Sequence, residues 1–234
     1  MLVVVGGHTR NIGKTSVVAG LIAALPEFHW TAIKITQYGH DVCSTDGEPC
    51  ACAPTDPAHP FAISEETDRN SGTDTSRFLA AGARRAYWVR TAAGELGHAM
   101  PALRGIFEAS EHVIAESNSI LRFSKPDLYL VVLDFAARDF KSTSRHHLDR
   151  ADALIVIDRD SRRPEWSGVS GRLWESKPRF RVRPPQWVTE AMAALVRGRL
   201  SSSTTSPAGA LRAGTGPAAD RRYARAARTP SDRT

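Results

Sequence analysis

Short apolar runs alternate with longer segments of helical periodicity over the first 160 residues of the chain. Short β-branched runs are typical of buried strands, whereas apolar positions three and four apart are typical of amphipathic helices. The predicted strands are residues 2–5, 30–35, 85–89, 112–115, 128–133 and 153–157. The predicted helices are residues 14–25, 75–83, 95–108 and 144–150. This alternation favours a three-layer α/β fold, a mostly parallel sheet with helices on both faces.

The periodic pattern weakens after residue 160, which divides the chain into three parts. We interpret residues 1–160 as the main domain and residues 161–200 as a C-terminal extension, with a last helix over 186–199. Residues 201–234 are rich in Ser, Thr, Ala, Gly, Pro and Arg without a core pattern, which predicts a disordered tail. Residues 39–73 also lack periodicity, and a loop insertion of that length in a compact domain is usually functional or mobile.

The charge of the chain gives no reason to expect a nucleic-acid partner. The formal net charge is +6, but six arginines and two aspartates place +4 of it in residues 201–234. The first residues lack the basic and apolar regions of a signal peptide, and no apolar run is long enough to span a bilayer. We therefore expect a cytoplasmic protein that binds neither nucleic acid nor a membrane.

A glycine-rich loop between the first predicted strand and helix carries the strongest chemical signal. Glycine lets the backbone approach a ligand, and the first turn of a helix supplies N–H groups and a positive dipole end for an anion. After Gly13, Lys14 would reach the β- and γ-phosphates of a nucleotide, and Thr15 would hold Mg²⁺. The residues predicted to bind the nucleotide are Gly7, His8, Thr9, Arg10, Asn11, Ile12, Gly13, Lys14, Thr15 and Ser16.

This loop is one residue longer than the usual phosphate-binding pattern. Counting back from Gly13, the first glycine would fall on His8, but the chain has it at Gly7. A strict match is thus excluded, whereas the order of strand, loop, Gly-Lys-Thr and helix is kept. The alternative is a turn that binds nothing, and the position between an apolar strand and a periodic helix favours binding.

Charged residues near the ends of other predicted strands would meet this loop, because ligands bind at the carboxyl ends of parallel strands. Glu116 ends an apolar run, where it would be a second Mg²⁺ ligand or a water-polarising carboxylate, or would cap a turn. Lys34 is either an edge-strand lysine that reaches solvent or a second cation for a phosphate or carboxylate substrate.

Asp74 and Arg77 open the helix that follows the long loop. Asp74 is either a plain N-cap or part of a switch that reaches Mg²⁺ or substrate when nucleotide is bound. Arg77 lies one turn further and could face the same cleft. We take Lys14, Glu116 and Asp74 as candidate catalytic residues, and add Lys34 to the residues predicted to bind the nucleotide.

The cysteines of the chain fall in one short segment of the long loop. His40, Cys43, Cys50 and Cys52 place an imidazole and three thiols within thirteen residues, a set that could complete a tetrahedral Zn²⁺ site. The spacing fits no standard zinc-finger template, and His59 is an alternative fourth ligand. A three-cysteine iron–sulfur site and cysteines that bind nothing are the other interpretations.

The motif Gly7-x5-Gly13-Lys14-Thr15 resembles the deviant Walker A loop of one P-loop NTPase branch, which contains dethiobiotin synthetase, cobyrinic acid amidases and the MobB family. MobB proteins are GTP-binding adaptors of molybdopterin-guanine dinucleotide synthesis. The order of segments 32–40, 74–83 and 113–117 resembles them most, and the resemblance spans about residues 2–157. It implies the three-layer P-loop NTPase fold. It also implies Lys14, Thr15 and Glu116 as phosphate and Mg²⁺ ligands and, more loosely, Asp74.

Some residues depart from the MobB pattern. Ser117-Asn118 replaces the glycine after the glutamate, and Ile35 replaces the histidine after the lysine. The cysteine segment is a further departure. The chain also lacks an obvious Asn-Lys-x-Asp guanine-reading motif, which leaves ATP and GTP open as the nucleotide. Asp134 and residues 139–141 lie where base contacts could occur.

Three functional hypotheses follow. The first is a MobB-like, Mg²⁺-dependent protein with weak NTPase activity and a role in molybdopterin-type cofactor assembly, acting with a partner protein or as a homodimer. The second is a synthetase resembling dethiobiotin synthetase, in which ATP activates a carboxylate and Lys34 holds the carboxyl-phosphate or carbamate. The third is a nucleotide-gated metal carrier that uses His40, Cys43, Cys50 and Cys52.

Overall fold

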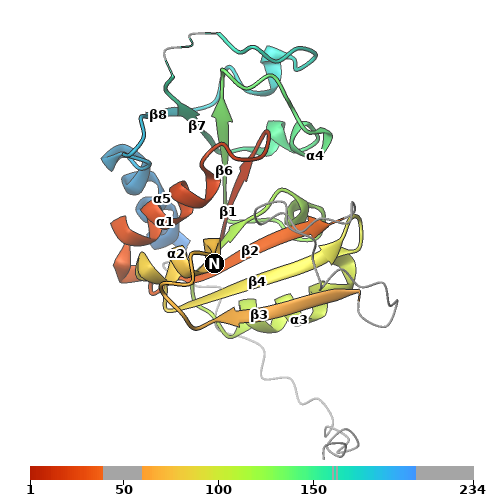
Figure 1. The fold of residues 1–234 in the computed structure, drawn as a ribbon. Coiled ribbons are helices and arrows are strands. Elements are labelled where there is room, and N and C mark those ends of the chain that lie inside the picture. The colour runs from red at the N-terminus through yellow and green to blue at the C-terminus, as the bar shows by residue number, and fades with distance from the viewer. Residues whose placement is uncertain (39–59, 160, 162, 204–234) are drawn as a thin grey trace, which may run out of the picture.

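The computed structural model of the protein describes residues 1–38, 60–159, 161 and 163–203. Over these residues the chain forms an eight-stranded sheet in the order β3-β4-β2-β5-β1-β6-β7-β8 (Figure 1). Each strand is parallel to its neighbours except β3, which is antiparallel to β4. The strands are β1 (Leu2–Gly7), β2 (Thr31–Tyr38), β3 (Phe61–Glu66), β4 (Arg85–Ala92), β5 (Val113–Glu116), β6 (Leu128–Asp134), β7 (Ala153–Ile157) and β8 (Arg179–Val182).

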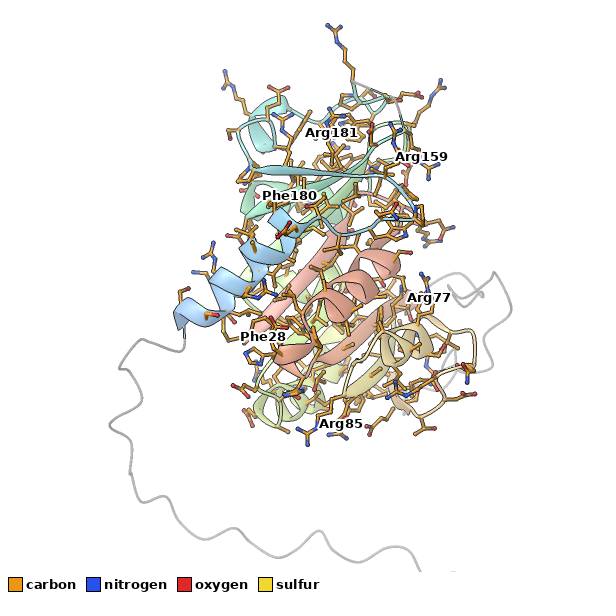
Figure 2. All side chains as sticks on the ribbon, turned by 90° about the vertical axis from the view of Figure 1, so that its left-hand side faces the viewer. Phe28, Arg77, Arg85, Arg159, Phe180 and Arg181 are labelled. Atoms are coloured by element: carbon orange, nitrogen blue, oxygen red, sulfur yellow. The ribbon has the colours of Figure 1, made fainter. Side chains whose placement is uncertain are left out.

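Helices cover both faces of this sheet, which confirms the predicted three-layer α/β fold. α1 (Lys14–Ala24), α2 (Asp74–Ala80) and α5 (Glu190–Ser203) pack on one face, and α3 (Leu96–Glu108) packs on the other (Figures 1 and 2). The connections contain the short helices α4 (Ser142–Arg145), η1 (Pro26–Phe28), η2 (Ser119–Arg122), η3 (Leu148–Arg150) and η4 (Gly171–Leu173). Within the described ranges, no helix is both long and apolar enough to cross a membrane.

The central strand β1 contributes to both hydrophobic cores. Val3 and Val5 pack in the core shared with α1, α2 and α5, whereas Leu2 and Val4 pack in the core shared with α3. A strand that is buried on both faces needs a continuous apolar run rather than an alternating one. The run at residues 2–5 therefore fixes β1 in the middle of the sheet, and the glycine-rich loop begins at its carboxyl end.

The elements that differ from the prediction lie at the edges of the fold. Residues 61–66 form the edge strand β3 inside the stretch predicted as a loop, and residues 179–182 form the other edge strand, β8. Both strands are partly exposed and mix charged with apolar residues, so neither has the apolar run of a buried strand. α5 continues to Ser203, into the segment predicted as tail. Residues 39–59 and 204–234 lie outside the described residues.

Candidate functional site

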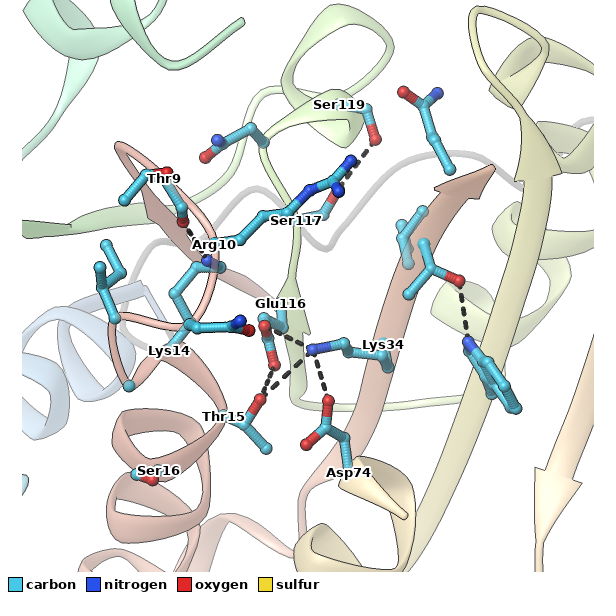
Figure 3. Close-up of a pocket in the computed structure, with 18 of the residues that line it drawn as sticks. Thr9, Arg10, Lys14, Thr15, Ser16, Lys34, Asp74, Glu116, Ser117 and Ser119 are labelled. Atoms are coloured by element: carbon cyan, nitrogen blue, oxygen red, sulfur yellow. Dashed lines mark hydrogen bonds and ion pairs between the residues drawn. The ribbon is translucent and has the colours of Figure 1, made fainter. Parts of the chain in front are cut away.

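A cavity of about 620 Å³ opens at the carboxyl edge of the central strands (Figure 3). Its walls come from the β1–α1 loop, β2, the start of α2, the turn after β5 and the segment that precedes α5. β5 and β6 are consecutive strands in the chain but lie on opposite sides of β1. Open α/β sheets bind ligands at such a switch point, so the position of the cavity is that of a ligand site.

The loop at residues 8–13 has the backbone of an anion-binding loop. Asn11 has φ 55° and Gly13 has φ 88°, both in the left-handed region. α1 begins at Lys14, and its first helical hydrogen bond runs from the Val17 N–H to the Gly13 carbonyl at 2.9 Å. Within the described part of the chain, the N–H groups of residues 9–13 donate to no backbone carbonyl. N–H groups left unpaired at a helix N-terminus are the donors that a phosphate group requires.

Gly13 has no space for a side chain. A Cβ atom there would lie 2.1 Å from Cζ3 of Trp187, and its positive φ already favours glycine. Trp187 lies between β8 and α5 and lines the cavity. The segment predicted as a C-terminal extension therefore packs directly onto the glycine-rich loop, a role that the sequence pattern did not indicate for this tryptophan.

Lys14 bends back over its own loop, where its Nζ donates to the Thr9 carbonyl at 2.6 Å. The pKa of Lys14 is lowered to about 8, chiefly by burial; the Lys34 ammonium also lowers it, and the Glu116 carboxylate acts in the opposite direction. A buried ammonium group is stabilised by an anion beside it, because the anion favours the charged form. Lys14 is thus positioned to bind a phosphate group at the mouth of the loop.

Asn118 fixes the start of the loop. Its Oδ1 accepts a hydrogen bond from the Gly7 N–H at 3.0 Å, and its Nδ2 donates to the Gly7 carbonyl at 2.8 Å. Both backbone groups of Gly7 are thereby satisfied by one side chain from the turn after β5. A Cβ atom at Gly6 would lie 2.3 Å from Asn118 Oδ1, so this contact requires glycine at that position as well. Asn118 was not predicted as a site residue, and its only signal was the departure from the MobB pattern at Ser117-Asn118.

His8 is fully buried and anchors the segment that follows β6. Its Nδ1–H donates to the Asp139 carbonyl at 2.9 Å, and its Nε2 accepts from the Asp134 N–H at 3.0 Å. These two roles require the neutral imidazole, and burial lowers the pKa of His8, which favours that form. His8 was predicted to bind the nucleotide, but its side chain packs against Phe140 and is not part of the cavity wall.

The same segment after β6 holds the loop at a second point. The Thr9 hydroxyl donates to Asp139 Oδ2. Asp134, considered as a base contact, instead pairs with Arg159 at 2.8 Å. Lys141 from this segment lines the cavity, and burial lowers its pKa. Residues 134–141 therefore position the glycine-rich loop and bring one further cation to the cavity.

The register of the sheet places Val5, Glu116, Lys34 and Trp88 in one row across four parallel strands. Side chains in such a row lie beside one another on the same face. β2 pairs with β5 on one side and with β4 on the other, so Lys34 belongs to an interior strand. Its interpretation as an edge-strand lysine is therefore wrong, and its ammonium group meets the Glu116 carboxylate below the loop.

Three oxygen atoms from three elements surround the Lys34 ammonium, and we call this group the lysine cluster: Thr15, Lys34, Asp74 and Glu116 (Figure 3). The Nζ lies 2.6 Å from Glu116 Oε1, 2.8 Å from Asp74 Oδ2 and 3.3 Å from Thr15 Oγ1. The Thr15 hydroxyl donates to Glu116 Oε2 at 2.8 Å. Burial lowers the pKa of Lys34, but the Glu116 and Asp74 carboxylates more than offset burial and raise it.

Thr73 caps α2, so the interpretation of Asp74 as a plain N-cap is wrong. Thr73 has an extended backbone, and its Oγ1 accepts from the Ser76 N–H at 3.0 Å. Asp74 is the first residue of the helix, and its carboxylate pairs with Lys34. A threonine cap satisfies the helix N-terminus and leaves the neighbouring carboxylate available to the cavity.

Arg77 links α2 to α1. Its Nη2 donates to Ser16 Oγ at 2.8 Å, and its Nη1 lies 3.6 Å from Asp74 Oδ1. The side chain lines the cavity and is 47% exposed, so it can also meet an anion there. A movement of the Asp74 side chain would therefore be transmitted through Arg77 to Ser16, the residue after Thr15.

The oxygen atoms of the lysine cluster fit a hard divalent cation. Mg²⁺ binds through hydroxyl and carboxylate oxygens together with substrate phosphates and water. The Thr15 hydroxyl and the buried Glu116 carboxylate supply such oxygens next to the loop, and Asp74 supplies a third group. These residues would hold Mg²⁺, which would neutralise charge on the phosphates.

The cavity continues past the lysine cluster along β2. Thr36 and Trp88 line this end, joined by a hydrogen bond of 2.9 Å from the indole N–H to the threonine hydroxyl. Ser117 and Ser119 line it too, and their hydroxyl oxygens are 3.0 Å apart. Arg10 extends from the loop toward Ser117 (Figure 3). Apart from Arg10, the groups named here are neutral, and they surround space beyond the positions that phosphates would occupy.

The structure brings most of the predicted site residues to one cavity. Those that line it are Thr9, Arg10, Asn11, Ile12, Gly13, Lys14, Thr15, Ser16, Lys34, Asp74 and Glu116. His40, Cys43, Cys50 and Cys52 lie outside the described residues. Within the described ranges, no group of three or more His, Cys, Asp and Glu side chains could hold a metal ion.

Two of the solved structures that are similar to this chain show how far the likeness extends. The crystal structure of HypB from Helicobacter pylori in complex with nickel matches with a TM-score of 0.50 and 16% identity, over 88% of this chain and 89% of that one. The "apo" form of LpxK from Aquifex aeolicus in complex with ATP has a TM-score of 0.43 and 16% identity, over 77% of this chain and 53% of that one. No protein-family model matches the chain, and no curated protein sequence matches it.

The likeness to HypB shows the fold. At 16% identity it carries no information on the ligand, but the aligned region includes nearly all of both chains. The protein has an α/β fold like that of P-loop NTPases. The glycine-rich loop lies in this fold where a phosphate-binding loop is expected, between the central strand β1 and α1.

Proposed function

We propose that the protein binds a nucleoside triphosphate with Mg²⁺ and hydrolyses it weakly. The observation that supports this most is the coincidence of the loop at residues 8–13 with the lysine cluster at one cavity. N–H groups that can donate to phosphate lie within one turn of α1 from oxygen atoms that can bind a divalent cation. Few ligands other than a nucleotide with its cation need both the phosphate donors and the cation ligands.

Each residue has a role in this proposal. The N–H groups of the loop and the Lys14 ammonium bind the phosphates, as an anion beside a helix N-terminus requires. Thr15 and Glu116 hold Mg²⁺, and Glu116 also orients the Thr15 hydroxyl through their hydrogen bond. Asp74 changes partner with nucleotide occupancy, because it connects the lysine cluster to α2.

The proposal is tested by measuring hydrolysis of ATP and GTP at increasing Mg²⁺ concentration. The wild-type protein should hydrolyse at least one of them only with Mg²⁺. Glu116→Gln should lower this rate about a hundredfold while nucleotide binding is retained, because an amide is a poor Mg²⁺ ligand. Glu65→Gln is the matched control, since this carboxylate is 40% exposed on β3 and pairs with Arg85. Equal rates for both variants would contradict the assignment.

We extend the proposal to a MobB-like role in cofactor assembly, with a partner protein or a second copy of the chain. Its support is the order of sequence segments, two of which supply Lys34 and Asp74 to the lysine cluster. Binding of purified protein to a molybdopterin-containing partner should then depend on the nucleotide. Binding to this partner that is the same with and without nucleotide would refute this role.

The residues that line the cavity beyond the lysine cluster favour a second candidate function, phosphoryl transfer from ATP to a carboxylate. The space beside Thr36, Trp88 and Ser117 would admit a small acceptor next to the Lys34 ammonium. The transfer forms an acyl phosphate and leaves ADP, so release of ADP should then increase when a small carboxylic acid is added. Release that is indifferent to a panel of such acids would count against it.

The third hypothesis, a nucleotide-gated metal carrier, depends on the segment from His40 to Cys52, outside the described residues. HypB has been crystallised with nickel, but the likeness to HypB concerns the fold. Elemental analysis of protein purified under reducing conditions tests this hypothesis directly. Absence of bound zinc or nickel would remove it.

A further inference from the structure

The Lys34 ammonium makes the contacts that the nucleotide's divalent cation would need. It contacts oxygens of Glu116 and Asp74 at 2.6 and 2.8 Å, and Thr15 Oγ1 lies 3.3 Å away. Mg²⁺ would take oxygens at about 2.1 Å, closer than an ammonium can approach. The cation and the ammonium therefore compete for the same oxygen atoms.

The surroundings of Lys34 strengthen this competition. Its side chain is 15% exposed and the Glu116 side chain is 4% exposed, so little water can take the place of either partner. Two carboxylates without a cation would repel each other in this partly dry site. Some positive charge must stay between them, and the fold supplies it from the middle of an interior strand.

We propose that Lys34 is a resident counter-ion of the divalent-cation site, which the nucleotide-bound Mg²⁺ displaces. The inference rests on the proposed function, since it concerns how that site is loaded. Without nucleotide, the ammonium keeps divalent cations away from Thr15 and Glu116. When Mg²⁺ arrives with the triphosphate, the ammonium leaves the carboxylates and moves to the phosphates, to which its flexible four-carbon stem can turn.

This exchange gives Asp74 a defined switch. Its carboxylate pairs with Lys34 at 2.8 Å and with Arg77 at 3.6 Å. Departure of Lys34 leaves Arg77 and the divalent cation as the positive charges beside this carboxylate, and Arg77 also binds Ser16 on α1. The start of α2 would therefore respond to the metal and not only to the nucleotide.

The test measures Mn²⁺ binding in the absence of nucleotide, with the paramagnetic resonance signal of free Mn²⁺ as the readout. The proteins are wild type, Lys34→Met, Lys34→Gln and the double variant Lys34→Met/Glu116→Gln. Lys125→Met is the matched control, because Lys125 is exposed in the loop before β6. Folding of each protein is checked by circular dichroism.

Lys34→Met and Lys34→Gln should each bind one Mn²⁺ at least about tenfold more tightly than wild type, because they leave the carboxylates without their cation. The gain should disappear in the double variant, and the control should match wild type. Folded variants that bind Mn²⁺ no better than wild type would overturn the inference. If wild type then still binds Mg²⁺ with nucleotide, the proposed function stands without it. Conversely, a gain in Mn²⁺ affinity with no nucleotide binding by wild type would refute the proposed function and the exchange on nucleotide binding, whereas Lys34 would remain the counter-ion of a divalent-cation site.

A second measurement on wild-type protein covers the case in which the variants do not fold. An amine-reactive reagent is followed by peptide mass spectrometry, with Lys125 as the internal reference. Lys34 should become at least about threefold more reactive with Mg²⁺ and nucleoside diphosphate than with the diphosphate and a chelator, because the carboxylates release it and the diphosphate lacks the terminal phosphate that would bind it. Reactivity that does not depend on the metal would overturn the inference.

Discussion

The two lysines of the cavity should have opposite effects on stability when they are replaced by methionine. Burial lowers the pKa of Lys14 from 10.5 to about 8, so its charge costs as much as about 3 kcal/mol at pH 7. Methionine keeps much of the apolar stem and removes that cost, whereas the lost bond to the Thr9 carbonyl is worth about 1 kcal/mol. Lys14→Met should therefore stabilise the nucleotide-free protein by about 2 kcal/mol.

Lys34→Met should have the reverse effect. It would leave the buried Glu116 carboxylate without its cation at 2.6 Å, and breaking a buried ion pair costs about 3 to 5 kcal/mol. Asp74 is 35% exposed and solvent compensates part of its loss, so the expected destabilisation is about 3 kcal/mol. The two variants should therefore differ by about 5 kcal/mol, although both replace a lysine in the same cavity.

Urea unfolding at pH 7, in a chelator and without nucleotide, measures both effects, and Lys125→Met should change stability by less than about 0.5 kcal/mol. The pH dependence gives an independent check. Folded wild type loses the Lys14 charge from about pH 8 upward, whereas the unfolded chain keeps it to about pH 10.5. Wild type therefore gains stability between these values, and the advantage of Lys14→Met should shrink. Two results would contradict these assignments: equal destabilisation by both variants, or a stability gain of Lys14→Met over wild type that does not change with pH.

Three further predictions concern the phosphate loop. Binding requires the charged form of Lys14, whose pKa burial lowers to about 8, so the Kd for a triphosphate should rise about tenfold between pH 7 and pH 9. Calorimetry measures this rise in Kd. Lys14→Arg should abolish the rise, and a wild-type Kd that does not change with pH would contradict the prediction. Asn118→Ala leaves both backbone groups of Gly7 unpaired and should cost about 2 kcal/mol in urea unfolding and about tenfold in nucleotide affinity. An unchanged nucleotide affinity would show that the two hydrogen bonds between Asn118 and Gly7 are not needed for binding. Gly13→Ala must displace Trp187 and should lower stability by about 2 kcal/mol and change the tryptophan fluorescence, whereas a neutral effect would mean that the contact yields easily.

The centre of the fold could be predicted because buried parallel strands leave continuous apolar runs. β1 and β6 are buried along their whole length, and their runs are visible in the sequence. The edge strands β3 and β8 are held by one neighbour each and carry charged residues, so pairing rather than composition decides their structure. The order of residues within one strand does not indicate which other strand it pairs with.

The candidate site could be predicted in part for a similar reason. Lys14 and Thr15 follow from the loop, because the chemistry there lies in consecutive residues. The neighbouring positions of Lys34 and Glu116 follow from the register of β2 with β5, which no local pattern shows. His8 was assigned to the nucleotide because it lies in the loop, but its ring turns to residues 134–141, which fold against the loop from far along the chain.

Trp187 shows the limit of prediction most clearly. It lies in the weakly patterned extension, and nothing in its neighbours indicates a contact with the glycine-rich loop. In the structure it packs on Gly13, so the glycine and the tryptophan depend on each other although they are 174 positions apart in the sequence. Such a pair becomes visible only when the sheet is assembled.

Calorimetry of Mg²⁺ with ATP and with GTP, on wild type and Lys14→Ala, shows most directly whether the cavity binds a nucleoside triphosphate. Wild type should bind one molecule of at least one nucleotide per chain. Lys14→Ala should bind it about a hundredfold more weakly, because a charge-assisted contact to the phosphates is lost. Cooperative unfolding of the variant would show that the fold is intact. A folded Lys14→Ala protein that binds as tightly as wild type, or a wild-type protein that binds neither nucleotide, would contradict the account.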